Sequence, residues 1–214
     1  MVRTLFTRVR SWHSFAAAVA LLLVACMIAA AGSLAGCAPP SEQGMTTSES
    51  LAEFEKSDMS GYACFEGYTG ETVFVDMTVA DITRKMDAGA TFALFTGYAN
   101  CPWCNVVVPA LNEQALAAKQ PVGYLDTRAN PEWKSNVDID GYDAFAERFA
   151  SVLDTDDDGA PHLYVPHVFF IKDGQLVYDH SGTVPEQETP DQALTSAQQE
   201  ELANYFTEGF AALS

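Results

Sequence analysis

Basic residues are scarce in this chain of 214 residues: eleven Lys and Arg stand against 29 Asp and Glu, a formal net charge of −18. Three of the eleven, and none of the acids, lie in residues 1–36, so the chain beyond that segment holds 8 basic residues and a net charge of −21. Binding to nucleic acid depends on clustered Lys and Arg that meet the phosphates. This composition therefore excludes nucleic acid as the partner.

Cysteine is also sparse, with five residues, and a single pair has two-residue spacing, at 101–104 (Cys-Pro-Trp-Cys). A zinc site would need His162 and His167 as its other ligands, because there is no second pair. A purely structural disulfide is another alternative, but the chain entropy removed by so short a loop is small. Two thiols this close form a small, strained disulfide that suits electron exchange, so the pair predicts thiol redox chemistry.

The segments around the pair predict where its sulfurs lie. Residues 91–96 have the length and the aromatic and β-branched content of a buried strand, and residues 103–118 show helical spacing of apolar side chains. Cys101 should lie at a helix N-terminus, where unpaired N–H groups and the helix dipole lower the pKa of a thiol, and Pro102 takes an early helical position. We expect Cys101 to attack the substrate and Cys104 to resolve the mixed disulfide.

A second apolar segment follows later in the chain. Residues 165–171 predict a strand entered through Pro166, and 172–175 a turn into a strand at 176–180. Strands that alternate with helices indicate an α/β fold. The other predicted elements are a strand at 71–77, a helix capped by Thr78 that runs to 88, a strand at 121–126, a helix at 142–153 and a C-terminal helix capped by Thr195.

These features together resemble the thioredoxin superfamily. The resemblance rests on the apolar strand before Cys-Pro-Trp-Cys and on four later features over about residues 71–210. Those features are Pro109 in the following helix, Val165-Pro166, the Lys172-Asp173-Gly174 hairpin and Gly182. The resemblance implies a thioredoxin-like α/β fold with a central mixed β-sheet flanked by helices.

The resemblance also implies roles for residues near the pair. Pro166 is expected to be cis and to pack against the cysteines, with the backbone of Val165 free to pair with an extended substrate. Pro102 and Trp103 are expected to contact the substrate as well. The interval between the pair and Pro166 is longer than in a compact thioredoxin, which predicts a helical insertion between the active-site half and the cis-proline.

Two departures from the family pattern concern chemistry. Many cytoplasmic thioredoxins have a buried Asp in the strand before the pair, where this chain has Phe95, so the resemblance assigns no base to the resolving cysteine. The Gly-Gly and Asp that bind glutathione in glutaredoxins do not follow Pro166, which argues against dependence on glutathione. No cofactor is expected.

The N-terminus indicates where the chemistry takes place. Arginines at 3, 8 and 10, an apolar run at 15–31 and small residues at 32 and 33 form the pattern of a secretory signal. The sequence Leu-Ala-Gly-Cys at 34–37 resembles the bacterial lipobox, in which the cysteine, here Cys37, is acylated after cleavage. The alternative is an uncleaved anchor helix, since the run approaches the roughly 17 residues that span a bilayer. We predict a lipoprotein signal peptide at 1–36, a lipid-anchored flexible linker at 37–60 and a thioredoxin-like domain at 61–214.

Two further features leave alternatives open. Asp154, Asp156 and Asp158 occupy the first, third and fifth positions of a calcium-loop pattern, but Val165 stands at the twelfth position in place of a bidentate Glu. A solvated acidic turn is therefore favoured over a calcium site. For Cys64, a half-buried free thiol is favoured over a regulatory or intermolecular disulfide.

Two functions remain open. The favoured one is a membrane-anchored extracytoplasmic thiol–disulfide oxidoreductase that exchanges electrons with exported protein thiols or disulfides and with a redox partner protein. It is similar to thioredoxin-like lipoproteins and to accessory proteins of bacteriocin maturation. The alternative is a thioredoxin-like binding module, or one that delivers a metal such as copper, without redox turnover.

Overall fold

The structure, a computed structural model, describes residues 47–130, 132, 134–135 and 139–214. The expected signal peptide, Cys37 and the first part of the expected linker lie outside these residues. Within the described ranges, no helix combines the length and the apolarity that crossing a bilayer requires.

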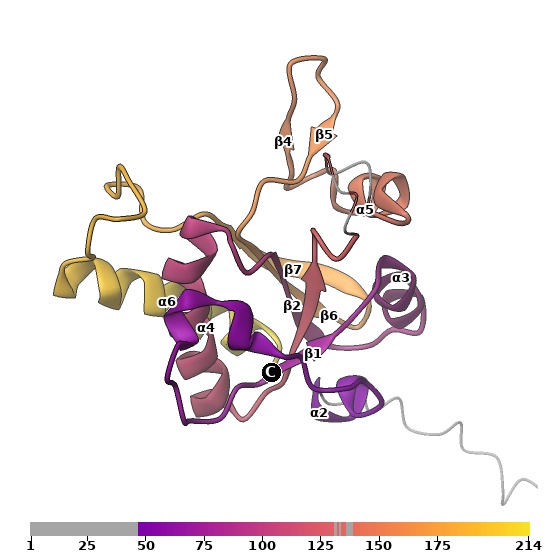
Figure 1. Cartoon of the computed structure of the whole chain (residues 1–214). Coiled ribbons are helices and arrows are strands. Elements are labelled where there is room, and N and C mark those ends of the chain that lie inside the picture. Colours follow the sequence, from indigo (N-terminus) through magenta and orange to yellow (C-terminus); the bar gives the residue numbers. More distant parts are fainter. Residues whose placement is uncertain (1–46, 131, 133, 136–138) are drawn as a thin grey trace, which may run out of the picture. The chain divides into compact units, whose positions relative to one another are not determined.

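Five strands of the described residues form one mixed sheet: β1 (Phe74–Asp76), β2 (Phe92–Gly97), β3 (Val122–Asp126), β6 (His167–Lys172) and β7 (Gln175–Ser181). Across the sheet their order is β1, β3, β2, β6, β7. The strands β1, β3 and β2 are mutually parallel, whereas β6 runs antiparallel to β2 and to β7. This central mixed sheet, flanked by helices, is the thioredoxin-like α/β arrangement that the resemblance implied (Figure 1).

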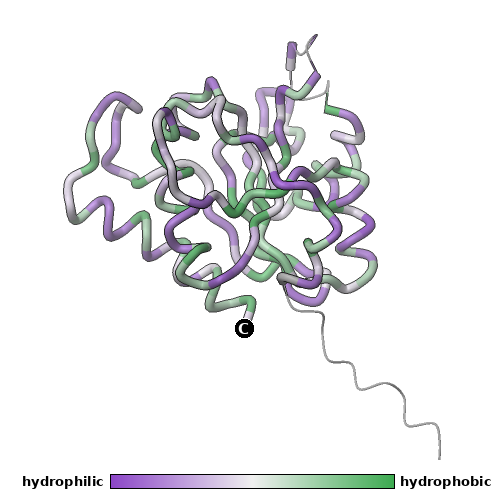
Figure 2. Tube along the Cα trace, turned by 60° about the horizontal axis from the view of Figure 1, so that its bottom comes forward, coloured by the Kyte–Doolittle hydropathy of each residue, from purple (hydrophilic) through white to green (hydrophobic). Residues whose placement is uncertain are grey.

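Helices cover both faces of the sheet: α2 (Thr47–Leu51), α3 (Val79–Asp87), α4 (Pro102–Ala118), α5 (Tyr142–Phe149) and α6 (Ser196–Ala212). Successive strand residues point to opposite faces. Ala93 and Phe95 of β2 pack in one apolar cluster with α4 and α6, whereas Phe92 and Leu94 pack in a second cluster with α2, α3 and α5. We name the first side, with α4 and α6, the cysteine face and the other the opposite face; Figure 2 shows the hydrophobic segments gathered between the helical layers.

Local signals in the sequence set the starts of α3 and α6 as predicted, whereas β1 is shorter than the predicted strand at 71–77. Thr78 and Thr195 each form a capping box at the start of α3 and α6, accepting a hydrogen bond from the third residue of the helix. The turn between β6 and β7 has positive φ angles at Asp173 (52°) and Gly174 (74°), a conformation that favours glycine. A side chain at Gly174 would also collide with the carbonyl oxygen of Met86, so this turn packs tightly against the end of α3.

The folded region begins earlier than the predicted boundary at residue 61. Helix α2 starts at Thr47, and both Leu51 and Met59 are buried in the apolar clusters. The backbone N–H of Ser57 donates to the carbonyl of Phe74 at 2.9 Å, which ties this segment to β1. The flexible-linker prediction is thus wrong for 47–60, because a few apolar side chains without a regular period are enough to dock the segment.

The predicted insertion lies between β3 and β6. It contains α5, which ends at Phe149 rather than at 153, and a short antiparallel hairpin of β4 (Asp154–Thr155) and β5 (Pro161–His162) that the sequence did not predict. Figure 1 shows this hairpin projecting beyond α5. Phe149 contacts Phe169 of β6, with ring centroids 4.5 Å apart, so α5 is packed on the opposite face.

Candidate active site

Cys101 lies at the end of the short loop that connects strand β2 to helix α4. It is the N-cap residue of α4, with Pro102 at the first helical position, as predicted. The backbone N–H of Cys104 donates to the Cys101 sulfur at 3.2 Å. Both cysteines are free thiols and buried, with Cys101 2% and Cys104 0% exposed.

The two thiols differ sharply in acidity. A hydrogen bond from the Cys104 thiol, helped by the backbone N–H groups of Cys104 and Trp103 and by the charge of Arg128, lowers the pKa of Cys101 to about 7. Burial, together with the adjacent Cys101, raises the pKa of Cys104 far above its ordinary value. At neutral pH about half of the Cys101 thiols are therefore reactive thiolates, whereas Cys104 is protonated.

The Val165–Pro166 peptide lies beside Cys101 and is cis, as the resemblance implied. The Cys101 thiol faces the carbonyl oxygen of Val165 at 4.0 Å. Strand β6 begins only at His167, one residue after the cis bond, rather than at Val165. The structure thus brings the two segments of the predicted site together.

The residues expected to contact substrate differ in exposure. Pro102 is exposed and Trp103 partly exposed, the latter packing against the apolar cluster of the cysteine face. Val165 is partly buried, and its neighbour Tyr164 is 51% exposed. Their contacts with a substrate stay a prediction.

Asn105 is a residue of the site that the sequence analysis missed. Its side-chain amide donates to the carbonyl oxygens of Ala99 and Cys101, both at 2.9 Å, and its carbonyl accepts from the backbone N–H of Cys64 at 2.9 Å. The Asn105 side chain thus links helix α4 to the loop before Cys101 and to the segment around Cys64, which precedes β1. Cys64 is a partly buried free thiol, and burial raises its pKa to about 11.

An aromatic cluster occupies the position of the missing buried Asp. Phe95 stacks on Tyr124 with ring centroids 5.6 Å apart, and the hydroxyls of Tyr62 and Tyr124 are hydrogen bonded at 3.0 Å. Burial, together with the nearby Cys104 and Asp126, raises the pKa of both phenols, so they are protonated at any physiological pH. Nothing in the sequence pattern pairs Tyr62 with Tyr124, since the pairing depends on how the segment before β1 folds.

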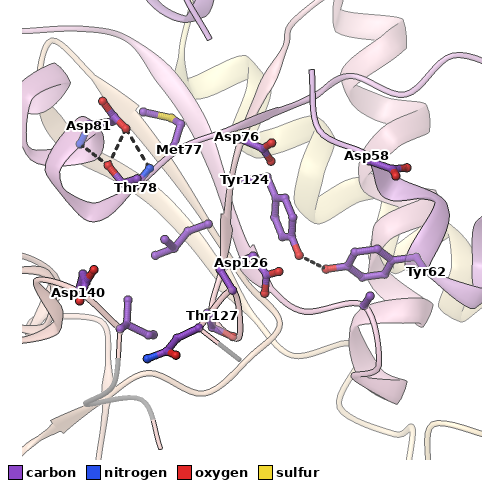
Figure 3. A pocket seen from close by; sticks show the side chains of 15 residues that line it. Asp58, Tyr62, Asp76, Met77, Thr78, Asp81, Tyr124, Asp126, Thr127 and Asp140 are labelled. Atoms are coloured by element: carbon purple, nitrogen blue, oxygen red, sulfur yellow. Dashed lines mark hydrogen bonds between the residues drawn. The ribbon is translucent and has the colours of Figure 1, made fainter. Parts of the chain in front are cut away.

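A cavity of about 740 Å³ adjoins this cluster, and Figure 3 shows its lining. Tyr62, Tyr124 and Ala99 are among its lining residues. Its remaining walls are strongly acidic and carry Asp58, Asp76, Asp81, Asp126 and Asp140.

The zinc and calcium alternatives lack a set of three or more side-chain ligands among the described residues. Within the described ranges, no three His, Cys, Asp or Glu side chains are grouped so that they could hold a metal. His167 lies on the opposite face from the pair, where its Nε2 lies 2.8 Å from an oxygen of Asp179, so it cannot complete a zinc site with Cys101. Asp156 accepts from the backbone N–H groups of Asp158 and Ala160, the pattern of an acidic turn.

Comparison with known proteins finds similarity to solved structures alone. No family model and no curated protein matches the chain. Similar solved structures include a proposed oxidoreductase with a thioredoxin fold (12% identity, TM-score 0.39, covering 51% of this chain and 83% of that one), a yeast mitochondrial 1-Cys peroxiredoxin (12%, 0.36, 63% and 99%) and oxidised thioredoxin O2 from Arabidopsis thaliana (16%, 0.35, 53% and 85%). We therefore infer the activity from the site itself.

Proposed function

We propose that this chain is a thiol–disulfide oxidoreductase that is anchored through a lipidated Cys37 outside the cytoplasmic membrane and acts on exported proteins. The observation that carries the proposal is the Cys101 thiol: it caps a helix, accepts the N–H of Cys104, has a pKa of about 7 and faces the cis Val165–Pro166 peptide. A structural disulfide or an inert buried thiol needs none of these features.

The chemistry follows from the difference between the two thiols. The Cys101 thiolate attacks a client disulfide, so that a new S–S bond joins Cys101 to the client and the other client sulfur leaves as a thiolate. Cys104 then loses its proton and attacks the Cys101 sulfur, which closes the Cys101–Cys104 disulfide and releases the second client thiol. Two electrons pass from the pair to the client, and the reverse sequence oxidises a client dithiol.

The burial of Cys101 favours a particular kind of client. Because Cys101 is only 2% exposed and its sulfur lies beside the Val165 backbone, a disulfide inside a rigid folded domain has poor access to it. An extended chain segment can approach along Val165 and pair with its backbone. Incompletely folded exported proteins fit this requirement.

Reduction of insulin with dithiothreitol as electron donor tests the activity. We expect the full chain to catalyse it, Cys101→Ser to abolish catalysis, and the matched variant Cys64→Ser to retain it, because Cys64 is a separate thiol with a raised pKa. Copper retention by the wild-type protein without insulin reduction would instead support the binding module.

The pH dependence of alkylation tests the acidity of Cys101. The iodoacetamide rate at Cys101 should increase about tenfold per pH unit below 7 and level off above it, because the reactive thiolate is then fully formed. The rate at Cys64 should still be increasing at pH 9. A Cys101 rate that follows the Cys64 profile would contradict the proposal.

The membrane anchor has its own test. In a bacterial host, the wild-type chain should incorporate a labelled fatty acid and sediment with membranes, whereas Cys37→Ser should lose the label. Labelling that persists in Cys37→Ser would place the lipid elsewhere.

A further inference from the structure

The resolving step needs a proton acceptor that the cysteine pair does not contain. Cys104 is fully buried and its pKa is strongly raised, so it stays protonated until a base removes the proton. The strand before the pair has Phe95 where a carboxylate would serve. A base for Cys104 belongs to the same reaction, so its assignment rests on the proposed function.

The alternation of side chains along the strands identifies Asp126 as a carboxylate on the cysteine face of the sheet. Phe95 and Gly97 of β2 point to the cysteine face, and Tyr124 and Asp126 of β3 point there as well because they pair with them in register. A Cβ atom at Gly97 would lie 3.0 Å from the Cys104 sulfur. The sulfur thus lies against Gly97, and Asp126 is the residue directly beside Gly97 on the neighbouring strand.

The cavity connects this carboxylate with solvent. Asp126 is partly exposed and lines the cavity together with the hydrogen-bonded Tyr62 and Tyr124 (Figure 3). The pKa values of both phenols respond to Cys104 and to Asp126, which places the phenol pair within electrostatic range of the thiol and the carboxylate. Burial raises the pKa of Asp126 itself, which makes it a better base than an exposed aspartate.

We propose that Asp126 is the proton acceptor for Cys104, through water in the cavity that the two tyrosines border. When the Cys101–client disulfide has formed, the Cys104 proton passes to a water molecule whose own proton goes to the Asp126 carboxylate. The Cys104 thiolate attacks the Cys101 sulfur, the bond from Cys101 to the client breaks, and the client leaves as a thiolate. Asp126 then releases its proton to solvent through the cavity.

The other charged groups near Asp126 determine which variant serves as its control. The backbone N–H of Arg128 donates to Asp126 at 2.8 Å, and its side-chain charge lowers the pKa of Asp126, whereas Asp76 of β1 raises it. Asp76 points to the cysteine face, one strand further from Gly97. The remaining charged or titratable groups of the cavity walls are Asp58, Asp81, Asp140, Tyr62 and Tyr124.

The experiment follows the second release of thionitrobenzoate after the reduced protein reacts with Ellman's reagent. Cys101 displaces one thionitrobenzoate and retains the other as a mixed disulfide, which Cys104 then releases by forming the Cys101–Cys104 bond. We use the full chain in mild detergent with Cys26, Cys37 and Cys64 replaced by serine, so that only the pair reacts. Asp126→Asn keeps the acceptor for the N–H of Arg128 and is compared with Asp76→Asn.

The sign of the effect separates the possible roles of Asp126. Loss of a general base should slow the second release by about 10²-fold at pH 7 and make it increase with hydroxide up to pH 9. A carboxylate that acted only through its field would do the opposite, because its removal eases formation of the Cys104 thiolate. Asp76→Asn, which removes the same charge, should not slow the release, and Asp126→Glu should restore part of the rate.

Three measurements decide the outcome. Alkylation of Cys101 at an unchanged rate in Asp126→Asn verifies that the fold and the attacking thiol are intact. Second release as fast as wild type in Asp126→Asn, or equal slowing in Asp76→Asn, would overturn the assignment of Asp126 while leaving the proposed function in place. If the wild-type protein released no second thionitrobenzoate beyond the level of Cys104→Ser, the proposed function itself would fail.

Discussion

The cysteine face of the sheet buries more aromatic side chains than the opposite face, and the two faces also differ in chemistry. The cysteine face holds the pair, the Tyr62–Tyr124 hydrogen bond and Asp126. The opposite face holds a phenylalanine cluster and the polar pair of His167 with Asp179. His167 directly follows Pro166 in the chain yet lies on the opposite face. Asp126 is on another strand but lies on the cysteine face. Strand alternation and register, more than sequence distance, decide which groups act on the cysteines.

The largest effect is expected from the phenylalanine cluster of the opposite face. Phe149 is fully buried and packs on Phe145 and Phe169 with ring centroids 4.7 and 4.5 Å away. Phe149→Ala should lower the free energy of unfolding by about 3–5 kcal/mol in urea denaturation. The alkylation midpoint of Cys101 should stay near pH 7 as long as the protein is folded. A shifted midpoint would mean that the two faces are coupled through the sheet.

The buried polar pair should have the next largest effect. His167→Ala removes a 2.8 Å contact with Asp179 and a ring stacked 4.0 Å from Phe169. We expect a loss of about 1–3 kcal/mol in stability, because a partly buried carboxylate loses its partner. Insulin reduction at a temperature where the variant is folded should be unchanged. A clear drop in turnover would give His167 a redox role and break the distinction between the faces.

The sequence predicted what depends on neighbouring residues and missed what depends on register. The helix start at Cys101 follows from Pro102 and the apolar strand before it, and the capping boxes follow from threonines with Asp or Gln three residues later. The proximity of Asp126 to Cys104 requires knowing that Asp126 pairs with Gly97 across two parallel strands. No local pattern carries that pairing.

Residues 47–60 and Asn105 were missed for related reasons. The early segment buries Leu51 and Met59 against a domain whose surface is unknown from the sequence, so its composition resembles a linker. Asn105 lies within a predicted helix, where an amide side chain gives no sign of its partners Ala99 and Cys64. Polar side chains that join segments far apart in the chain are visible only once the chain is folded.

Loss of either capping box should have a smaller effect on stability, and the effect should be the same on both faces of the sheet. Thr78 starts α3 on the opposite face and Thr195 starts α6 on the cysteine face, with the same arrangement of hydrogen bonds. Thr78→Ala and Thr195→Ala should each cost about 1 kcal/mol in urea denaturation. Similar losses of stability in the two variants, with an unchanged alkylation rate of Cys101, would sharpen the comparison. They would show that both faces contribute to the stability of the fold, whereas the reactivity of Cys101 depends on the cysteine face alone. A change in Cys101 reactivity in Thr195→Ala alone would show that α6 supports the site.

The smallest expected effect is electrostatic and concerns two surface arginines. Arg128 lies over the ring of Tyr98, 3.5 Å from its centroid, and its charge lowers the pKa of Cys101, whereas Arg148 on α5 pairs with Asp87 at 2.6 Å. Arg128→Gln should raise the pKa of Cys101, since the thiolate loses a positive neighbour. Alkylation at pH 7 should then slow by about twofold, because exposed charges contribute less than about 1 kcal/mol.

Two controls, high salt and a substitution of Arg148, show whether this small effect is specific to Arg128. The difference between Arg128→Gln and wild type should vanish in about 1 M salt, where screening acts within roughly 3 Å. Arg148→Gln removes the same charge from α5, which packs on the opposite face, and should leave the alkylation rate unchanged at every salt concentration. If both variants slowed alkylation equally, net charge alone would control the thiol. If only Arg128→Gln does so, the reactivity of Cys101 is set by the groups that the fold gathers on its own face.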